Sequence, residues 1–274
     1  MAIGKLDGDE LFDLAVANYN SGDVTILLGV EDGTFVLKDH YYAGDGPNSI
    51  AIGYLDGDDV LDLAVANRVS NKVAVLLGDG TGAFARPLEF DVGNGPFSVA
   101  IGKLDGDDVL DLAVANGYSD SGSVLLGRGD GTFDEGVPYD VGDEPLSVAI
   151  GDLNGDDDLD LAVANNHHDN VALLLNLGDG RFSRAVFFST DSHPYFVAMG
   201  DLNLDDALDL VVANYGGHTV SVLLNEIPTP DGCLRDPEWQ CDGDVDGDGQ
   251  INPVDSGIVQ SLFGTCEAPR EVCP

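Results

Sequence analysis

The sequence predicts an all-β protein: a β-propeller of five 49-residue, four-stranded repeats, followed by a small cysteine-rich tail. Three observations lead to this fold class. One motif recurs five times at a constant spacing of 49 residues. Each copy holds short apolar runs separated by Gly, Asp and Pro clusters. All four cysteines lie beyond residue 232. Four strands in a unit of about 40 to 50 residues are typical of a propeller blade.

The repeat is recognised by landmarks that keep the same step along the chain. The five copies share a segment close to AIGKLDGDDVLDLAVAN, and these segments begin at Ala2, Ala51, Ala100, Ala149 and Ala198. Phenylalanines recur at 35, 84, 133 and 182, and prolines at 47, 96, 145 and 194. A period this regular indicates one structural unit used five times.

The third repeat illustrates the expected strands. We predict strands over 98–102, 110–116 and 122–127, and a fourth after the GDGTF segment at 129–133. The alternation in Leu-Asp-Leu-Ala-Val-Ala favours strands over helices. One sheet cannot bury both of its faces alone, so we expect the apolar positions to pack between neighbouring repeats.

The chain divides into a propeller over 1–225, a linker over 226–232 and a tail over 233–274. The fifth repeat ends after its third strand, at 219–225, so the last blade is expected to be incomplete. Two alternatives follow: a five-bladed ring that closes imperfectly, or a fragment of a larger propeller whose upstream blades and signal peptide are missing. Met1 falls inside a predicted strand and favours the second alternative.

The charge of the chain excludes several function classes. It carries 50 acidic and 11 basic residues, a formal net charge of −39. Nucleic-acid binding requires clustered Lys and Arg, and anionic membranes attract the same residues, so neither partner is expected. No apolar run is long enough to insert in a membrane. The hydrophobic content of 43%, arranged in short runs, indicates a folded core rather than disorder.

The turn between the first two strands of each repeat is rich in carboxylates. In the fourth repeat, oxygen donors stand at alternate positions of a nine-residue loop: Asp152, Asn154, Asp156, Asp158 (through its carbonyl) and Asp160. The fifth repeat offers Asp201, Asn203, Asp205 and Asp209. Hard oxygen ligands in this number suit Ca²⁺.

The first three repeats lack the first of these ligands. Lys5, Tyr54 and Lys103 stand in its place. The remaining candidates are Asp7, Asp9 and Asp13; Asp56, Asp58 and Asp62; and Asp105, Asp107 and Asp111. These loops either bind calcium with a reduced ligand set or are simply acidic turns. The five loops and one loop in the tail contain 25 of the 50 acidic residues, so half of the acidity is local.

At these residues the sequence resembles the FG-GAP repeats, also called VCBS repeats, of integrin α-subunits and many secreted bacterial proteins. The resemblance rests on the D-x-N-G-D-x-x-x-D-L loop, the V-x-L-L-x-x-G-D-G-x-F segment and the Ala-Asn pair after the second strand, over about 225 residues. It implies a calcium-binding propeller that acts as an extracellular recognition platform, secreted or on the cell surface. It does not identify a ligand.

The tail contains a loop of the EF-hand type. Its ligands would be Asp244, Asp246, Asp248, Gln250 (through its carbonyl) and Asp255. A short helix is expected over 256–263, and the combination resembles a dockerin, although a single such segment argues against a cohesin-type partner. The four cysteines Cys233, Cys241, Cys266 and Cys273 are disulfide candidates. Proximity favours pairing Cys233 with Cys241 and Cys266 with Cys273; all three connectivities and a zinc site remain alternatives.

The loops between the second and third strands are the least uniform part of the repeat. They predict a carbohydrate-binding rim formed by Tyr19, Arg68, Tyr118, His167, His168, Tyr215 and His218. The alternative is that they are ordinary variable surface loops.

No G-x-S-x-G or H-E-x-x-H motif is present, and His167-His168 is the single histidine cluster. We therefore expect no enzymatic activity. The predicted function is an extracellular calcium-binding recognition and adhesion module whose partners are glycans or extracellular proteins. The alternative is the non-catalytic portion of a secreted polysaccharide-degrading enzyme or complex.

Overall fold

The computed structural model describes residues 1–225, and within them the chain is all-β, with no helix. The strands are β1 (Ala2–Gly4), β2 (Asp13–Asn18), β3 (Asp23–Gly29), β4 (Phe35–Tyr42), β5 (Pro47–Gly53), β6 (Asp62–Asn67), β7 (Lys72–Leu76), β8 (Leu88–Asp91), β9 (Pro96–Gly102), β10 (Asp111–Asn116), β11 (Ser121–Leu125), β12 (Val137–Asp140), β13 (Pro145–Gly151), β14 (Asp160–Asn165), β15 (Asn170–Leu174), β16 (Val186–Ser189), β17 (Pro194–Gly200), β18 (Asp209–Asn214) and β19 (Thr219–Leu223). The predicted linker and tail, with their calcium loop and cysteines, lie outside the described residues.

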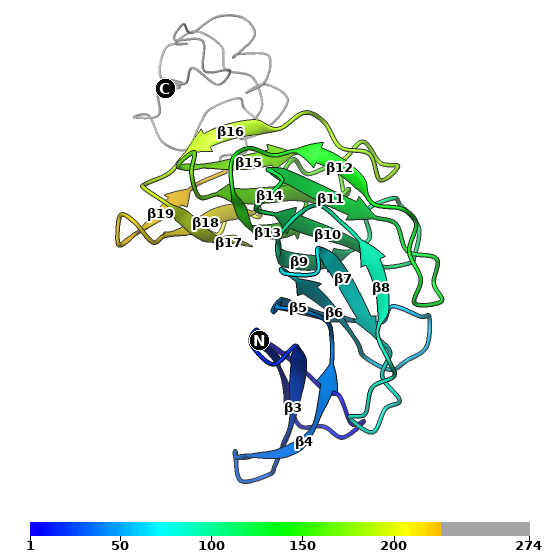
Figure 1. The fold of residues 1–274 in the computed structure, drawn as a ribbon. Coiled ribbons are helices and arrows are strands. Elements are labelled where there is room, and N and C mark those ends of the chain that lie inside the picture. The colour runs from blue at the N-terminus through cyan, green and yellow to red at the C-terminus, as the bar shows by residue number, and fades with distance from the viewer. Residues whose placement is uncertain (226–274) are drawn as a thin grey trace, which may run out of the picture.

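Each repeat forms one antiparallel sheet whose strands follow chain order. The sheets are β1-β2-β3-β4, β5-β6-β7-β8, β9-β10-β11-β12, β13-β14-β15-β16 and β17-β18-β19. The prediction of four-stranded blades is confirmed in four repeats, and within residues 1–225 the last blade has three strands, as predicted. The sheets succeed one another along an arc that does not close (Figure 1), so the described chain is an incomplete β-propeller.

The recurrent prolines begin the innermost strand of four sheets: Pro47, Pro96, Pro145 and Pro194. The ladder register shifts beside the proline in each of these strands. Proline cannot donate to a ladder, and it is tolerated at the first residue of an edge strand. The sequence landmark therefore marks where each new blade begins.

The core consists of four hydrophobic clusters, one between each pair of consecutive sheets. Leu63 and Val65 of β6 face the first sheet, whereas Ala64 and Ala66 of the same strand face the third. Alternate side chains of a strand point to opposite faces, so one strand supplies two interfaces. The expectation that apolar positions pack between repeats is confirmed.

The two ends of the arc expose the faces that interior sheets bury. Val171 is fully buried, while its equivalent in the last sheet, Val220, is 61% exposed. At the other end, Ile3 of β1 is 59% exposed. These faces are apolar because every repeat carries the same pattern, whether or not a neighbour covers it.

The antiparallel topology gives the propeller two distinct ends. The acidic loops, which join the first and second strands of each sheet, lie at one end together with the turns between the third and fourth strands. The opposite end, which we call the rim, consists of the turns at 19–22, 68–71, 117–120, 166–169 and 215–218 together with the inter-sheet connections at 43–46, 92–95, 141–144 and 190–193. The divergent loops thus lie opposite the acidic loops, as the repeat pattern predicts.

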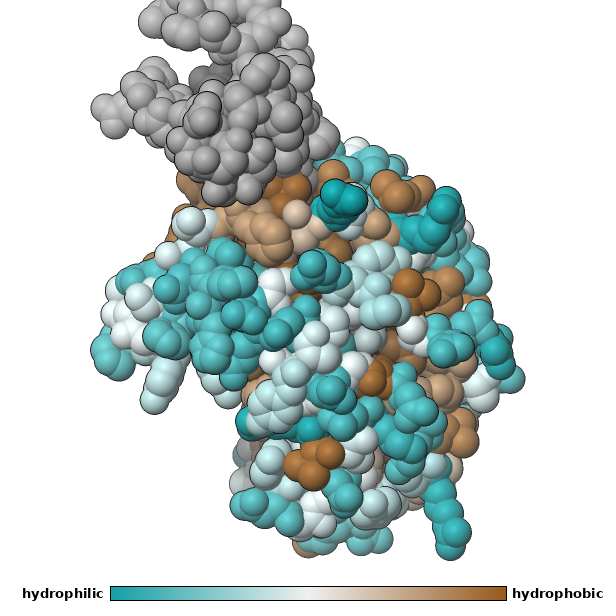
Figure 2. All heavy atoms as spheres, turned by 45° about the horizontal axis from the view of Figure 1, so that its top comes forward, coloured by the Kyte–Doolittle hydropathy of each residue, from teal (hydrophilic) through white to brown (hydrophobic). Residues whose placement is uncertain are grey.

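The face drawn in Figure 2 carries many hydrophilic side chains and separate hydrophobic patches. Within residues 1–225 there is no helix long and apolar enough to cross a membrane.

Candidate functional site

The last aspartate of each acidic loop is a buried cross-link within its own sheet. Asp111 is fully buried, and its two oxygens accept hydrogen bonds from the backbone N–H groups of Leu104 and Gly127. The same pair of bonds, at 2.6–2.9 Å, recurs in all five repeats, at Asp13, Asp62, Asp111, Asp160 and Asp209. Each carboxylate therefore ties the start of the acidic loop to the end of the third strand.

Burial raises the pKa of three of these carboxylates. Desolvation raises the pKa of Asp62 and of Asp160 to about 6, and it raises the pKa of Asp111. The two backbone N–H donors lower the pKa in each case, because they stabilise the ionised form, but the desolvation effect is larger. The five aspartates predicted as metal ligands at this position thus have a structural role as acceptors for two backbone N–H groups, and their metal binding stays a prediction.

The acidic loops of the fourth and fifth repeats share one conformation. Asp152 accepts hydrogen bonds from the backbone N–H groups of Gly155, Asp156 and Asp157. Asp201 binds the equivalent groups in the fifth repeat. Asp157 and Asp206 adopt left-handed backbone angles, with φ of 71° and 70°. Calcium loops often place glycine at this sixth position, and Asp tolerates the same conformation.

The first three repeats wind differently. The lysine at the first loop position reaches the residue at the sixth: Lys103 Nζ lies 2.7 Å from Asp108 Oδ1, and Lys5 pairs with Glu10 in the same way. Glu10, Asp59 and Asp108 do not take positive φ. In the first and third repeats an ammonium group thus stands where the later repeats have a carboxylate, and in the second repeat Tyr54 takes this place.

The predicted donor set for a hard cation is thus complete in two repeats and lacks its first ligand in the other three. Asp152, Asn154, Asp156 and the carbonyl of Asp158 offer oxygens around one tight turn, in which Asn154 Nδ2 donates to Asp156 Oδ2 at 2.9 Å. In repeats one to three, Lys5, Tyr54 and Lys103 stand where the first ligand would be. No group of three or more His, Cys, Asp or Glu side chains in the described part of the chain is already gathered as a metal site. Calcium binding stays a prediction.

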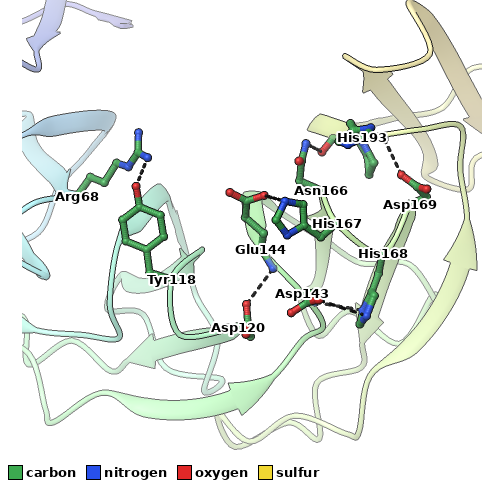
Figure 3. Close-up of polar contacts among 11 residues, drawn as sticks. Arg68, Tyr118, Asp120, Asp143, Glu144, Asn166, His167, His168, Asp169 and His193 are labelled. Carbon is green, nitrogen blue, oxygen red and sulfur yellow. Dashed lines mark hydrogen bonds and ion pairs between the residues drawn. The ribbon is translucent and has the colours of Figure 1, made fainter.

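At the rim, Tyr19, Arg68 and Tyr118 come together from three consecutive repeats. The Arg68 guanidinium lies 4.1 Å from the ring centroid of Phe97, 5.0 Å from that of Tyr118 and 5.9 Å from that of Tyr19. It also donates to the Tyr118 hydroxyl (Figure 3). Phe97 and Tyr118 pack edge to face with centroids 5.6 Å apart. We call these four residues the arginine cluster.

His167 and His168 each face a carboxylate of the preceding connection. His167 Nε2 lies 2.9 Å from Glu144 Oε2, and His168 Nε2 lies 3.5 Å from Asp143 Oδ2. His168 Nδ1 also accepts a hydrogen bond from the Asp143 backbone N–H. Figure 3 shows Tyr118, Glu144 and His167 on neighbouring turns of the rim. These histidines are therefore held against the connection and do not form a histidine cluster of their own.

Tyr215 and His218 form a third group in the last repeat. The rings of Tyr215 and Tyr195 are 6.3 Å apart, and those of Tyr215 and His218 are 6.5 Å apart. Tyr215 is 73% exposed. The seven rim residues predicted from sequence thus occupy one end of the molecule in three groups, at the early, middle and late repeats.

Five rim residues that the divergence of the turns does not indicate lie on the inter-sheet connections and on the strands that follow them: Phe97, Asp143, Glu144, His193 and Tyr195. A signal was available for two of them. Glu144 and His193 stand, at the 49-residue spacing, where earlier repeats have Gly46 and Gly95. All four positions have positive φ, with 50° at Glu144 and 55° at His193. Non-glycine residues in this conformation are uncommon and cluster at functional sites.

Comparison with solved structures finds chains of similar fold at low sequence identity. The complex of BBS1N with ARL6DN has a TM-score of 0.57 at 16% identity, over 85% of this chain and 65% of that one. An Agrocybe aegerita lectin that recognises non-reducing terminal N-acetylglucosamine has a TM-score of 0.55 at 17% identity, over 81% and 65%. The periplasmic gluconolactonase PpgL of Pseudomonas aeruginosa has a TM-score of 0.58 at 16% identity, over 81% and 64%. This chain spans slightly less than two thirds of each of them.

A comparison with curated proteins finds no significant match. The model of the FG-GAP-like repeat, in contrast, matches four times, at residues 5–65, 54–114, 103–163 and 152–212. Successive matches are offset by the 49 residues of the repeat, and each includes one acidic loop with its buried aspartate and the loop of the next repeat. Since the matches together run from residue 5 to residue 212, the chain belongs to the FG-GAP-like repeat family.

Proposed function

We propose that this protein is a non-catalytic recognition module that binds carbohydrate through the rim of its propeller. The observation that carries the proposal is the gathering of the divergent side chains at one end. Tyr19, Tyr118 and Tyr215 are exposed there beside the acid–histidine pairs. A tyrosine presents a flat apolar face and a hydroxyl, which together suit a sugar ring with its C–H faces and polar edges. A lectin is among the proteins of the same fold, so this fold is compatible with sugar recognition.

We further propose that calcium stabilises the acidic loops of the fourth and fifth repeats, at the end opposite the rim. Asp152, Asn154 and Asp156, with their equivalents in the fifth repeat, would hold the cation. Bound calcium would supply positive charge to a chain whose net charge is −39. Millimolar free calcium is an extracellular condition, so the proposed location is secreted or at the cell surface.

The decisive experiment is a glycan array with the purified calcium-loaded chain, followed by calorimetric titration of the sugars that bind. A Tyr118→Ala, Tyr215→Ala double variant should lose binding. A matched control with Phe35→Ala, an exposed aromatic residue on β4 outside the rim, should retain it. Absence of binding to every sugar by the folded protein contradicts the proposal, as does equal binding by the rim variant and the wild type.

One observation favours a second candidate function, carbohydrate hydrolysis. The His167–Glu144 pair has the geometry of a histidine oriented by a carboxylate, as in many general bases. Under this alternative, substrate turnover would be measurable and His167→Ala would abolish it. Under the proposed function, neither the wild type nor His167→Ala should turn over a carbohydrate substrate. Binding without turnover also leaves room for a role as the non-catalytic part of a polysaccharide-degrading complex.

A further inference from the structure

We propose that the arginine cluster is a subsite for the carboxylate of an acidic sugar, so that the preferred ligand is a uronate-containing oligosaccharide. This inference rests on the proposed carbohydrate-binding function and goes further by naming the class of sugar. It concerns Arg68 with Tyr19, Phe97 and Tyr118, at the junction of the first three repeats.

The first step is the charge of Arg68. Most basic side chains in residues 1–225 pair with a carboxylate, as Lys72 does with Glu89 and Arg128 with Asp134. Lys38, Arg86 and Arg184 have no such ion pair, but they are exposed to water. Within the described residues, Arg68 alone is both partly shielded from solvent and without a carboxylate within 4.0 Å. In a chain with 50 acidic residues, this exception needs a reason.

The second step is how the guanidinium is held. Aromatic rings position it, with Phe97 closest at 4.1 Å. Its Nε is buried and has no hydrogen-bond partner, and the one hydrogen bond it makes is donated by Nη2 to the Tyr118 hydroxyl. Nη1 makes no hydrogen bond to any residue in 1–225, and Figure 3 shows no dashed contact at that end of the side chain. Nη1 therefore keeps its donors for a ligand.

The third step is the chemistry that this arrangement recognises. A planar guanidinium matches a carboxylate in size, shape and charge, and the pair gains strength where aromatic surfaces lower the local dielectric. The negative field of the chain repels anions in general, so a bound carboxylate requires a local positive group at the point of contact.

The fourth step is why the carboxylate should belong to a sugar. Tyr19 is 44% exposed and Tyr118 is 56% exposed, so both rings flank Arg68 as accessible surfaces. A sugar ring bearing a carboxylate can place its C–H face on a tyrosine and its carboxylate on Arg68 at the same time. A glutamate side chain of a peptide has the same carboxylate but no ring to cover the tyrosines.

The test compares acidic oligosaccharides with their carboxyl-reduced counterparts, in which the same backbone is neutral. The probes are oligomers of galacturonate, glucuronate and mannuronate, titrated into the calcium-loaded chain by calorimetry. We expect at least one acidic oligomer to bind about 10- to 100-fold more tightly than its reduced form, the range for a hydrogen bond to a charged group. Arg68→Gln should remove this preference, and Arg68→Lys should retain only part of it, because lysine keeps the charge without the fork.

The matched control is Arg86→Gln, which removes another arginine without an ion pair, outside the rim, and should change no affinity. Thermal melting establishes that each variant is folded, and Tyr118→Phe tests the cluster without removing a ring. Equal affinity for acidic and reduced sugars overturns the carboxylate subsite and leaves the carbohydrate-binding function standing. A glutamate-rich peptide that binds more tightly than every uronate overturns the sugar assignment. Absence of binding to any sugar overturns the proposed function itself.

Discussion

Asp62 Oδ2 lies 2.8 Å from the backbone nitrogen of Leu55 and accepts its hydrogen bond at a fully buried position. The other oxygen of the same carboxylate accepts from Gly78 at 2.8 Å. One side chain therefore joins the start of the acidic loop to the segment that follows the third strand of the blade. Because this pair of bonds recurs in every repeat, the fold depends on it five times.

The first prediction concerns this cross-link. Asp62→Ala leaves two buried N–H groups without acceptors, each worth about 1–3 kcal/mol, so the free energy of unfolding should fall by roughly 2–5 kcal/mol. Asp62→Asn keeps one acceptor oxygen, so its free energy of unfolding should fall by less than that of Asp62→Ala. Chemical denaturation measures both changes. The control is Asp59→Ala, an exposed aspartate of the same loop, which should cost less than about 0.5 kcal/mol. Similar losses at the two positions would contradict the cross-link.

The second prediction concerns calcium. Ligand binding to the folded state raises stability, by about 2.7 kcal/mol per site at a concentration one hundred times the Kd. Melting temperature should therefore be higher in millimolar Ca²⁺ than in chelator. The double variant Asp152→Ala, Asp201→Ala should lose this increase, whereas Asp107→Ala in the third repeat should keep it. An identical melting temperature with and without calcium would show that these loops do not hold the metal in the native state.

The third prediction is a pH dependence in the absence of metal. Burial raises the pKa of Asp62 and Asp160 to about 6, above the value of about 3.9 expected in the unfolded chain. Between these values Asp62 and Asp160 bind more protons in the folded state, so their contribution to stability is greatest at low pH and is lost as pH rises through 6. Denaturation in chelator and high salt should give a larger unfolding free energy at pH 5 than at pH 7. The double variant Asp62→Ala, Asp160→Ala should show a smaller difference, and an unchanged difference would exclude these groups as its source.

The fourth prediction compares equivalent residues at the middle and the end of the arc. Leu173 is 2% exposed between two sheets, while Val222, one repeat later, is 54% exposed. Leu173→Lys would bury an unpaired charge and should cost about 3–5 kcal/mol or prevent folding. Val222→Lys should cost less than about 0.5 kcal/mol. Circular dichroism and denaturation of the two variants measure the contrast, and an equally severe loss at Val222 would show that its face is covered in the folded protein.

The fifth prediction concerns Glu144, whose φ of 50° is a position where earlier repeats have glycine. Glu144→Gly should raise the unfolding free energy by about 1 kcal/mol, because glycine adopts this conformation without strain. The same change removes the partner of His167 and should weaken ligand binding at the rim. The substitution Gly95→Glu at the equivalent position should be destabilising. If Glu144→Gly instead lowers the unfolding free energy, Glu144 contributes to folding rather than to recognition.

Much of the fold could be predicted from the sequence. The 49-residue period indicated the repeated sheets, and the alternation of Leu, Ala and Val indicated strands that bury both faces. The pattern also indicated that the fifth repeat has three strands up to residue 225, as it does in the described part of the chain. These features are local or periodic, so a single chain displays them without its neighbours.

The candidate site was predictable only in part. Divergence among the repeats indicated which loops form the rim, and it identified Arg68 and His167. It did not indicate Phe97 beside Arg68 or Glu144 beside His167. These contacts join residues 23 to 29 positions apart on different repeats, and a sequence pattern carries no information on the distance between their side chains.

The sequence by itself thus determined the number of repeats, the strands in each and the end of the molecule at which the variable loops lie. Only the tertiary structure decided that the last loop aspartate, predicted as a metal ligand, is a buried acceptor for two backbone N–H groups. The reason is physical. The spacing of carboxylates is the same whether they face a cation or the backbone, and the packed sheet that removes water from Asp62 exists only once the chain is folded.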